Sequence, residues 1–372
     1  MSLYGNEFPL SETLIYLNHA AVAPWPARTE AAISQFAKEN TLQGAERYDR
    51  WLKKEHELRQ QLRVLINAPS TDDIALQKNT SEGLSVIAYG LDWQPGDRII
   101  ITNQEFPSNR IVWESLAGLG VEVIEADISG SDPELAIIQL LTPSTRLISV
   151  SSVQYGTGLT LNLKRLGAAC KQNNTLFCVD AIQSIGVMPL DVQAIDADFV
   201  VADGHKWMLG PEGIALLYVR EQVRPKLKLL QYGWHMVANA GNYDTKEWEP
   251  AASAKRFECG SPNMLGIHAL SASLSLLLEL GMEEVHRLVD ERVEYLIEGI
   301  NRRSQLQLLS PTTPERRSGI VTFSVRDGDN SALFQSLKEQ RVVCALRGGG
   351  IRFSPHFYTP EKVLAKALEL LP

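Results

Sequence analysis

The chain has 372 residues, of which 44% are hydrophobic and 22% are charged, and these proportions are typical of a folded globular protein rather than a disordered one. Its length exceeds that of most single domains, so two packed domains are expected. The net charge of -8 and the absence of a Lys/Arg-rich run argue against a nucleic acid or an anionic membrane as partner. A small molecule is the expected ligand.

The first residues, MSLYGNEFPLSETLIYL, lack the basic region and apolar run of a signal peptide, so the chain is expected in the cytoplasm. The most apolar long stretch, from Leu265 to Leu280, is too short to span a bilayer and predicts a buried helix. The four cysteines are far apart and form no C-x-x-C pair, which predicts neither disulfides nor a structural zinc site. They are Cys170, Cys178, Cys259 and Cys344.

Short apolar, β-branched runs alternate with helical patterns over the first part of the chain. The expected strands are Ile74 to Leu76, Arg98 to Thr102, Glu122 to Glu125, Leu147 to Val153, Leu176 to Asp180, Phe199 to Ala202 and Gly213 to Val219. The expected helices are Ser108 to Gly118, Asp132 to Leu141 and Asn162 to Gln172. This order predicts an α/β fold with a mostly parallel sheet, covered by helices, whose binding residues lie at the carboxyl ends of strands.

After Val219 the chain becomes a loop rich in Trp, Tyr, Gly and Asn, and two long helices are then expected from Asn263 to Leu280 and from Met282 to Arg302. A smaller α+β unit follows. Its expected elements are Ile320 to Val325, Ser331 to Gln340, Val342 to Leu346, Ile351 to Ser354 and Pro360 to Leu371. We therefore expect a large domain over residues 15–255 and a small domain over 256–372, joined by residues 1–14.

Two strand ends carry side chains suited to one kind of chemistry. Lys206 follows the strand that ends near Ala202, and Asp180 ends a second strand of the same sheet. A lysine on a turn is by default a solvated charge, and an aspartate at a strand end is often a helix cap or an ion-pair partner. Pyridoxal 5'-phosphate (PLP) chemistry, however, requires this pair, an amine to form an imine and a carboxylate to keep the pyridine nitrogen protonated.

A third feature is suited to phosphate binding. In Asn79-Thr80-Ser81-Glu82-Gly83, two hydroxyl residues open a helical pattern directly after a short strand. The free N–H groups at a helix N-terminus bind phosphate. A capping box without any ligand explains the same residues, since Asn79 and Glu82 have the required spacing.

Seven motifs occur in one order along nearly the whole chain, from about residue 14 to 370. They are Tyr16-Leu17-Asn18, Asn79-Thr80-Ser81-Glu82-Gly83, Glu105-Phe106-Pro107-Ser108-Asn109, Val179-Asp180-Ala181-Ile182-Gln183, Gly204-His205-Lys206-Trp207, Gly260-Ser261-Pro262-Asn263 and Arg352-Phe353-Ser354-Pro355-His356. Together they resemble the class V aminotransferases, a branch of the fold-type I PLP enzymes that includes cysteine desulfurases, kynureninase and isopenicillin N epimerase. The resemblance implies a large domain with a seven-stranded-type sheet, a small C-terminal domain and a homodimer.

The resemblance also implies a role for each matching residue. Lys206 would form the Schiff base and move the proton at the substrate α-carbon, and Asp180 would hold the pyridine nitrogen. Arg352 would receive the substrate α-carboxylate, a task that suits a guanidinium, and His19 is a further expected substrate contact. The remaining expected cofactor contacts are Thr80, Ser81 and His205 at the phosphate, Gln183 at the ring hydroxyl, Phe106 on the ring face and Ser261 from the neighbouring subunit.

Three departures from the family bear on the reaction. Phe106 stands where many desulfurases place a histidine, so stacking on the ring is kept while acid-base capacity is lost. Asp203 stands where a small hydroxyl residue often contacts phosphate, and its carboxylate would repel that group. The run Arg347 to Arg352, R-G-G-G-I-R, has no cysteine where desulfurases carry their persulfide cysteine. Cys344, the nearest thiol, is expected to be a buried small hydrophobe.

These observations predict a PLP-dependent enzyme that acts on a small amino acid, with aminotransferase-like chemistry as the first choice. The alternatives are a cysteine or cystine carbon-sulfur lyase and an amino-acid epimerase, both without a persulfide cysteine, because the three reactions diverge after removal of the α-proton. A non-catalytic scaffold is disfavoured, since such a protein needs neither Lys206 nor Asp180. No metal site is expected.

Overall fold

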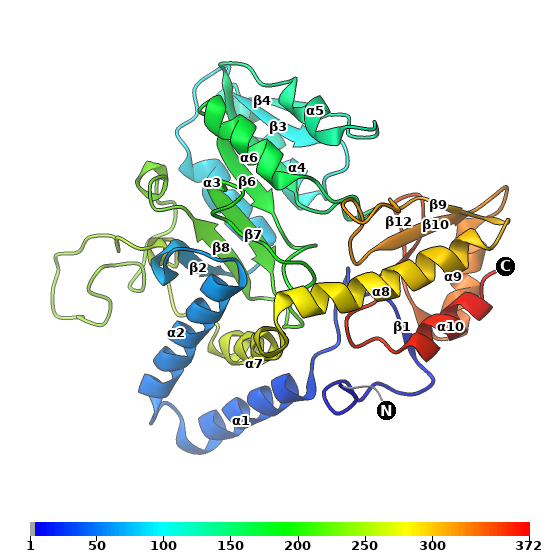
Figure 1. The fold of residues 1–372 in the computed structure, drawn as a ribbon. Coiled ribbons are helices and arrows are strands. Elements are labelled where there is room, and N and C mark those ends of the chain that lie inside the picture. Colours follow the sequence, from blue (N-terminus) through cyan, green and yellow to red (C-terminus); the bar gives the residue numbers. More distant parts are fainter. Residues whose placement is uncertain (1–3) are drawn as a thin grey trace.

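The computed structural model describes residues 4–372 and is built around one seven-stranded sheet, shown in cyan and green in Figure 1. In spatial order the strands are β2 (Ile74–Gln77), β8 (Ala215–Val219), β7 (Phe199–Asp203), β6 (Leu176–Asp180), β5 (Thr145–Ser151), β3 (Arg98–Thr102) and β4 (Glu122–Ala126). Only β8 runs antiparallel to its neighbours within this sheet. The predicted strands β3 and β6 are confirmed to the residue, and the mostly parallel α/β sheet is confirmed as a whole.

Both faces of this sheet are buried, as expected for a parallel sheet covered by helices. In β3, Ile99 and Ile101 enter one hydrophobic cluster, while Ile100 enters the other. The covering helices that directly follow strands are α3 (Thr80–Gly90), α4 (Ser108–Glu114), α5 (Pro133–Ile138) and α6 (Leu163–Gln172). Because the strands alternate with these helices, their carboxyl ends lie at one edge of the sheet.

Three further helices pack together outside the sheet. They are α1 (Ala27–Gln43), α2 (Tyr48–Leu65) and α7 (Met264–Leu280), and α7 contacts both of the others along its length. Leu270 of α7 also lies against Gly204, beside the Lys206 turn. The packing therefore places α7 with the large unit, whereas the sequence assigned it to the small domain beyond residue 255.

The small unit has a four-stranded antiparallel sheet in the order β12 (Ala345–Arg347), β13 (Gly350–Phe353), β10 (Val321–Val325) and β9 (Leu306–Leu308). Its helices are α8 (Met282–Asn301), α9 (Asn330–Glu339) and α10 (Glu361–Glu369). The run expected as one strand from Val342 to Leu346 is divided at Cys344, because β11 (Val342–Val343) pairs instead with β1 (Ile15–Tyr16). Residues 15 and 16 therefore belong with the small unit.

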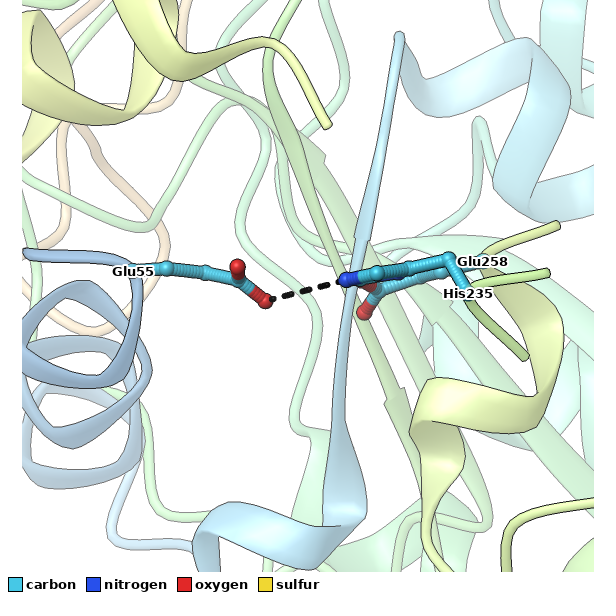
Figure 2. A group of neighbouring side chains, drawn as sticks. All are labelled: Glu55, His235 and Glu258. Carbon is cyan, nitrogen blue, oxygen red and sulfur yellow. Dashed lines mark ion pairs between the residues drawn. The ribbon is translucent and has the colours of Figure 1, made fainter. Parts of the chain in front are cut away.

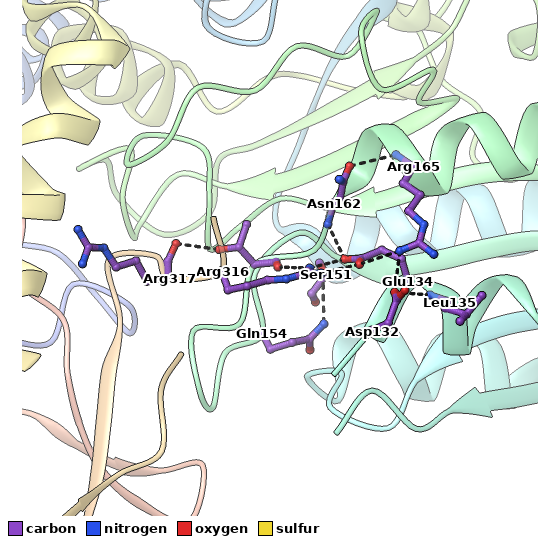
Figure 3. A network of polar contacts seen from close by, with 10 residues as sticks. Asp132, Glu134, Leu135, Ser151, Gln154, Asn162, Arg165, Arg316 and Arg317 are labelled. Atoms are coloured by element: carbon purple, nitrogen blue, oxygen red, sulfur yellow. Dashed lines mark hydrogen bonds and ion pairs between the residues drawn. The ribbon is translucent and has the colours of Figure 1, made fainter. Parts of the chain in front are cut away.

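A polar network joins the two units (Figure 3). Arg316, just before β10, donates to both carboxylate oxygens of the buried Glu134 in α5, at 2.5 and 2.8 Å. Glu134 also accepts from the backbone N–H of Asn162 at the start of α6, and the neighbouring Arg317 pairs with Asp290 of α8. This contact holds the small sheet beside the carboxyl edge of the large one.

Within residues 4–372 no single helix is long and apolar enough to cross a membrane. The pair formed by α7 and α8 reaches the required length and hydropathy together, but the two helices meet at 84°.

Candidate active site

The expected site residues gather at the carboxyl edge of the large sheet. Asp180 is the last residue of β6, and it lies beside Val201 of the neighbouring parallel strand β7. Lys206 follows β7 after a short turn, and Phe106 follows β3 in the segment that leads into α4. Residues far apart in the sequence are thus brought to one place by the parallel order of the strands.

The turn that carries Lys206 is held rigidly by the backbone. Gly204 N–H donates to the Ile214 carbonyl at 2.9 Å, and Leu209 N–H donates to the Lys206 carbonyl at 3.0 Å. Leu209 has a φ of 61°, an uncommon value for a leucine that the buried surroundings must maintain. The Lys206 ammonium lies 5.6 Å from the centre of the Phe106 ring, which is 39% exposed. An exposed aromatic face is therefore available beside the amine.

Asp180 and Lys206 have shifted pKa values with opposite signs. Burial raises the pKa of Asp180, and repulsion from the buried Glu105 carboxylate adds to the effect, while the Ile182 N–H and Lys206 oppose it. Burial likewise lowers the pKa of Lys206, although Asp180 attracts its charge. A buried carboxylate without an adjacent cation needs one, and an amine that loses its proton readily is suited to nucleophilic attack.

The N-terminus of α3 lies next to the same strand ends. Asn79 caps the helix by accepting from Glu82 N–H at 2.9 Å, so the capping reading of this motif is confirmed. Thr80 is buried, and its hydroxyl accepts the backbone N–H of Asp203 at 3.1 Å. Ser81 is exposed and donates to Ser108 of α4 at 2.9 Å. The helix start with its hydroxyls is available for an anion as well as capped.

Arg352 reaches the site from β13 of the small unit. It is 2% exposed, its guanidinium donates to the Tyr155 carbonyl at 2.7 Å, and its Nε has no partner within residues 4–372. Burial lowers the pKa of Arg352 to about 10, and repulsion from Arg347 contributes. An incompletely paired, buried guanidinium needs an anionic partner such as a carboxylate.

Sequence reasoning missed Arg347 as a candidate. Ala345 pairs with Arg352 and Arg347 pairs with Gly350, so the two arginines lie diagonally on one face of the β12–β13 hairpin. The positive charge of Arg347 also acts on Lys206. The signal in the sequence was the spacing of the two arginines across Gly348 and Gly349, which have positive φ values and form the turn.

The buried polar atoms without hydrogen-bond partners test whether these residues fit PLP. Of those found in residues 4–372, the ones near the site belong to Gln154, Asp203, His205 and Arg352. Such atoms are rare in folded proteins and point to a missing polar ligand. Their acceptors and donors, together with Asp180 and the start of α3, are suited to a ring hydroxyl, a pyridinium, a phosphate and a carboxylate. The residues fit the cofactor.

Two expected contacts are occupied by the protein itself. Both ring nitrogens of the fully buried His19 are bonded, Nδ1 to the Ser354 carbonyl at 2.7 Å and Nε2 to the Tyr358 hydroxyl at 2.6 Å. His19 therefore packs between the units, and we do not retain it as a substrate contact. Gln183 accepts from the Trp207 indole at 2.9 Å and donates to the Ala20 carbonyl at 3.0 Å, leaving one N–H for a ring hydroxyl.

The buried His19 makes stability depend on pH. Burial lowers the pKa of His19 to about 4, whereas an unfolded histidine titrates near 6.5. The unfolded chain therefore binds the proton first, so stability is complete above pH 6.5 and falls as the pH drops toward 4, by about 3 kcal/mol in all. Urea unfolding across this range should show this loss, and a His19→Gln variant should show a smaller slope. A matched change at the exposed His56 should leave the slope unchanged, and equal slopes in all three proteins would contradict the assignment.

Ser261 is exposed in a single chain and lies apart from Lys206. It lines a shallow surface pocket with Gln77, Lys78 and Gly213, and Asn263 near it donates to the Gly213 carbonyl at 3.0 Å. Its expected role in a neighbouring subunit's site remains a prediction.

No thiol is well placed to take sulfur at the site. Cys170, Cys178 and Cys344 are buried, and burial raises the pKa of all three, as expected for Cys344. Cys259 is partly exposed and contacts Gln231, on the Ser261 side of the molecule. A thiolate is the reactive form of cysteine, and these surroundings do not favour it for the buried three.

Three potential metal ligands lie together elsewhere (Figure 2). They are Glu55 of α2, His235 of the long loop and Glu258, with ligand atoms within 4.8 Å of one another. Arg59, however, already bonds both carboxylates at 2.6 to 2.7 Å. A metal cation there would be repelled by the guanidinium, so this cluster is better described as a buried charge network.

Comparison with known proteins agrees with this site. A sequence model of the family described as Aminotransferase class-V matches residues 15–356. A protein of Methanothermobacter thermautotrophicus named as a probable cysteine desulfurase is 30% identical, over 98% of this chain and 96% of its own length. The Bacillus subtilis protein named uncharacterized aminotransferase YcbU is 28% identical, over 80% of this chain and 78% of its own length.

The fold is matched equally well. The cystine C-S lyase C-DES, solved in complex with its reaction product cysteine persulfide, superposes with a TM-score of 0.90 at 26% identity, covering 97% of this chain and 98% of the other. A mutant of C-DES was solved with glycine covalently linked to its PLP cofactor, and it superposes with a TM-score of 0.91 at 25% identity, covering 98% of each chain. With its sheet, its site residues and a match over nearly the whole chain, this protein belongs to the aminotransferase class-V family of PLP-dependent enzymes.

Proposed function

We propose that this PLP-dependent class V enzyme is a carbon-sulfur lyase that acts on cysteine or cystine. Three side chains carry the general part of the proposal, because Asp180, Lys206 and Arg352 come from three different strands and meet at one sheet edge. When bound, PLP withdraws electrons from an amino acid joined to it and so makes the α-proton removable. The residues of the chain must then hold the substrate, keep the ring charged and move that proton.

The proposed roles follow from the surroundings of each residue. Asp180 would hold a pyridinium, which supplies the cation that its buried carboxylate needs. Phe106 offers its exposed ring as a stacking face. Arg352 would bind the substrate α-carboxylate through the donors it does not use on Tyr155, with Arg347 adding positive charge on the same side.

Lys206 would take up the α-proton, since its lowered pKa makes the neutral amine accessible near neutral pH. Phe106 offers no proton, so the lysine is the base at this position. The leaving sulfur is then expected to depart with the product, because no reactive thiol of the chain lies near Arg352. The cystine C-S lyase named above supports this choice, as its product is a free persulfide.

Transamination is a second candidate, and the description of the family and the name of the Bacillus subtilis relative favour it. The same residues serve both reactions, which differ in where the proton taken up by Lys206 is returned. We further propose that the enzyme works in the cytoplasm as a homodimer, in which Ser261 reaches the neighbouring subunit's cofactor, as the family resemblance implies.

One experiment separates the two reactions. The purified holoenzyme is mixed with L-cysteine, L-cystine or L-alanine without a keto acid, while keto acid, sulfide and the cofactor spectrum are followed. A lyase should release pyruvate in large excess over active sites from a sulfur amino acid and keep its yellow colour. A transaminase should instead release about one keto acid per site and lose that colour. The lyase proposal fails if none of the sulfur substrates yields catalytic pyruvate.

A further inference from the structure

Asp203 is a buried carboxylate in an unexpected place. It is the last residue of β7, 6% exposed, and its backbone N–H donates to the Thr80 hydroxyl at the start of α3. The residues around it, Thr80 and His205, are those proposed to hold the cofactor phosphate. A lone carboxylate there would oppose the binding of an anion.

The structure gives this carboxylate one counterpart. Its Oδ1 lies 3.0 Å from Nδ1 of His205, and within residues 4–372 no lysine or arginine is within ion-pair distance of Asp203. The Nδ1–H direction is not aligned with the oxygen, so the contact is close without being a finished hydrogen bond, and neither atom has another partner. A small rotation of the imidazole ring would complete the bond.

The His205 ring is otherwise free to turn toward a ligand. Its backbone is fixed, since the His205 carbonyl accepts Ala23 N–H at 2.9 Å and the Gly204 N–H before it is also bonded. Its side chain is 15% exposed, and Nε2 makes no hydrogen bond to residues 4–372. An imidazole whose Nδ1–H is held by a carboxylate presents Nε2 in a defined direction, as in other sites where a carboxylate orients a histidine.

We propose that Asp203 is a positioning residue that orients His205 for the cofactor phosphate, and this proposal rests on the function proposed above. A His205 ring with both nitrogens protonated lies between two anions, donating Nδ1–H to Asp203 and Nε2–H to a phosphate oxygen. The carboxylate then strengthens cofactor binding through the histidine rather than weakening it directly. This accounts for a charge that a small hydroxyl residue often replaces in the family.

The sign of one measurement decides between the two effects. Apo protein is titrated with PLP, and the dissociation constant is compared for wild type, Asp203→Asn, His205→Gln and the double variant. If Asp203 acts through His205, Asp203→Asn should weaken PLP binding about tenfold, the usual size for loss of a charge-assisted hydrogen bond. In the His205→Gln background the same change should have no effect or should tighten binding, because only repulsion is left.

Asp196→Asn, at an exposed turn before β7, serves as the matched control and should leave the constant unchanged. Tighter binding by Asp203→Asn in the wild-type background, or an equal loss in both backgrounds, would overturn the proposal. Nitrogen-15 NMR of His205 in the wild-type apo protein provides a test that needs no variant at Asp203, and a tautomer without a proton on Nδ1 would also reject it. A protein that binds no PLP at all would refute the proposed function instead.

Discussion

Replacement of Lys206 by alanine is expected to lower kcat by at least about 10,000-fold, since one side chain supplies both the covalent link to the cofactor and the base at the α-carbon. Steady-state release of pyruvate or keto acid measures this loss. The variant should also lose the yellow absorbance of the linked cofactor. It should still bind PLP, because Thr80, Ser81 and His205 remain in place.

The matched control is Lys38→Ala on the exposed face of α1, which should keep full activity. Added methylamine should restore part of the turnover of the Lys206→Ala variant if the missing group is an amine acting on a proton. Retention of the yellow colour together with more than a few per cent of wild-type turnover would show that another residue holds the cofactor.

Replacement of Arg59 by methionine is expected to destabilise the protein by about 3 to 5 kcal/mol, because it leaves two buried carboxylates without their cation. Arg59 is bonded to Glu55 and Glu258, and Glu258 also accepts Leu76 N–H at 2.8 Å. His235 lies 3.7 to 3.9 Å from these carboxylates and does not replace the lost charge at neutral pH, since burial lowers its pKa. Chemical unfolding at pH 7 measures the loss.

A matched control on the same helix is Arg63→Met, which removes an arginine bonded only to Gln60 and the Ala68 carbonyl. That change should cost less than about 1 kcal/mol, the usual range for a substitution near the surface. Adding Glu55→Gln and Glu258→Gln to Arg59→Met should recover much of the stability, because the unpaired charges are gone. A loss below about 1 kcal/mol for Arg59→Met would mean that water reaches the carboxylates.

Strand prediction succeeded where the sequence was locally consistent. The runs Arg98 to Thr102 and Leu176 to Asp180 were found to the residue, because an apolar run buried on both faces has sharp ends at polar residues. The run from Val342 to Leu346 failed as one strand, since its first half pairs with β1 from the other end of the chain. No local pattern announces a partner more than 300 residues away.

The site shows the same division. The sequence correctly pointed to Gly348 to Gly350 as a close approach of backbones, and a Cβ at Gly348 would lie 2.3 Å from the Gly156 carbonyl oxygen. It did not show that both nitrogens of His19 are bonded, or that Arg347 shares a hairpin face with Arg352. These facts depend on side chains that meet through the fold.

The sequence by itself determined the family, the alternation of strands and helices, and the residue types that PLP chemistry needs, because motifs and hydrophobic periods are local properties of a chain. Only the tertiary structure decided which charges are buried together. Asp180 beside β7, Asp203 against His205, and Arg59 between two glutamates depend on strand order and helix packing. The energy of a charge depends on its distance to other charges and to water, and the fold sets both distances.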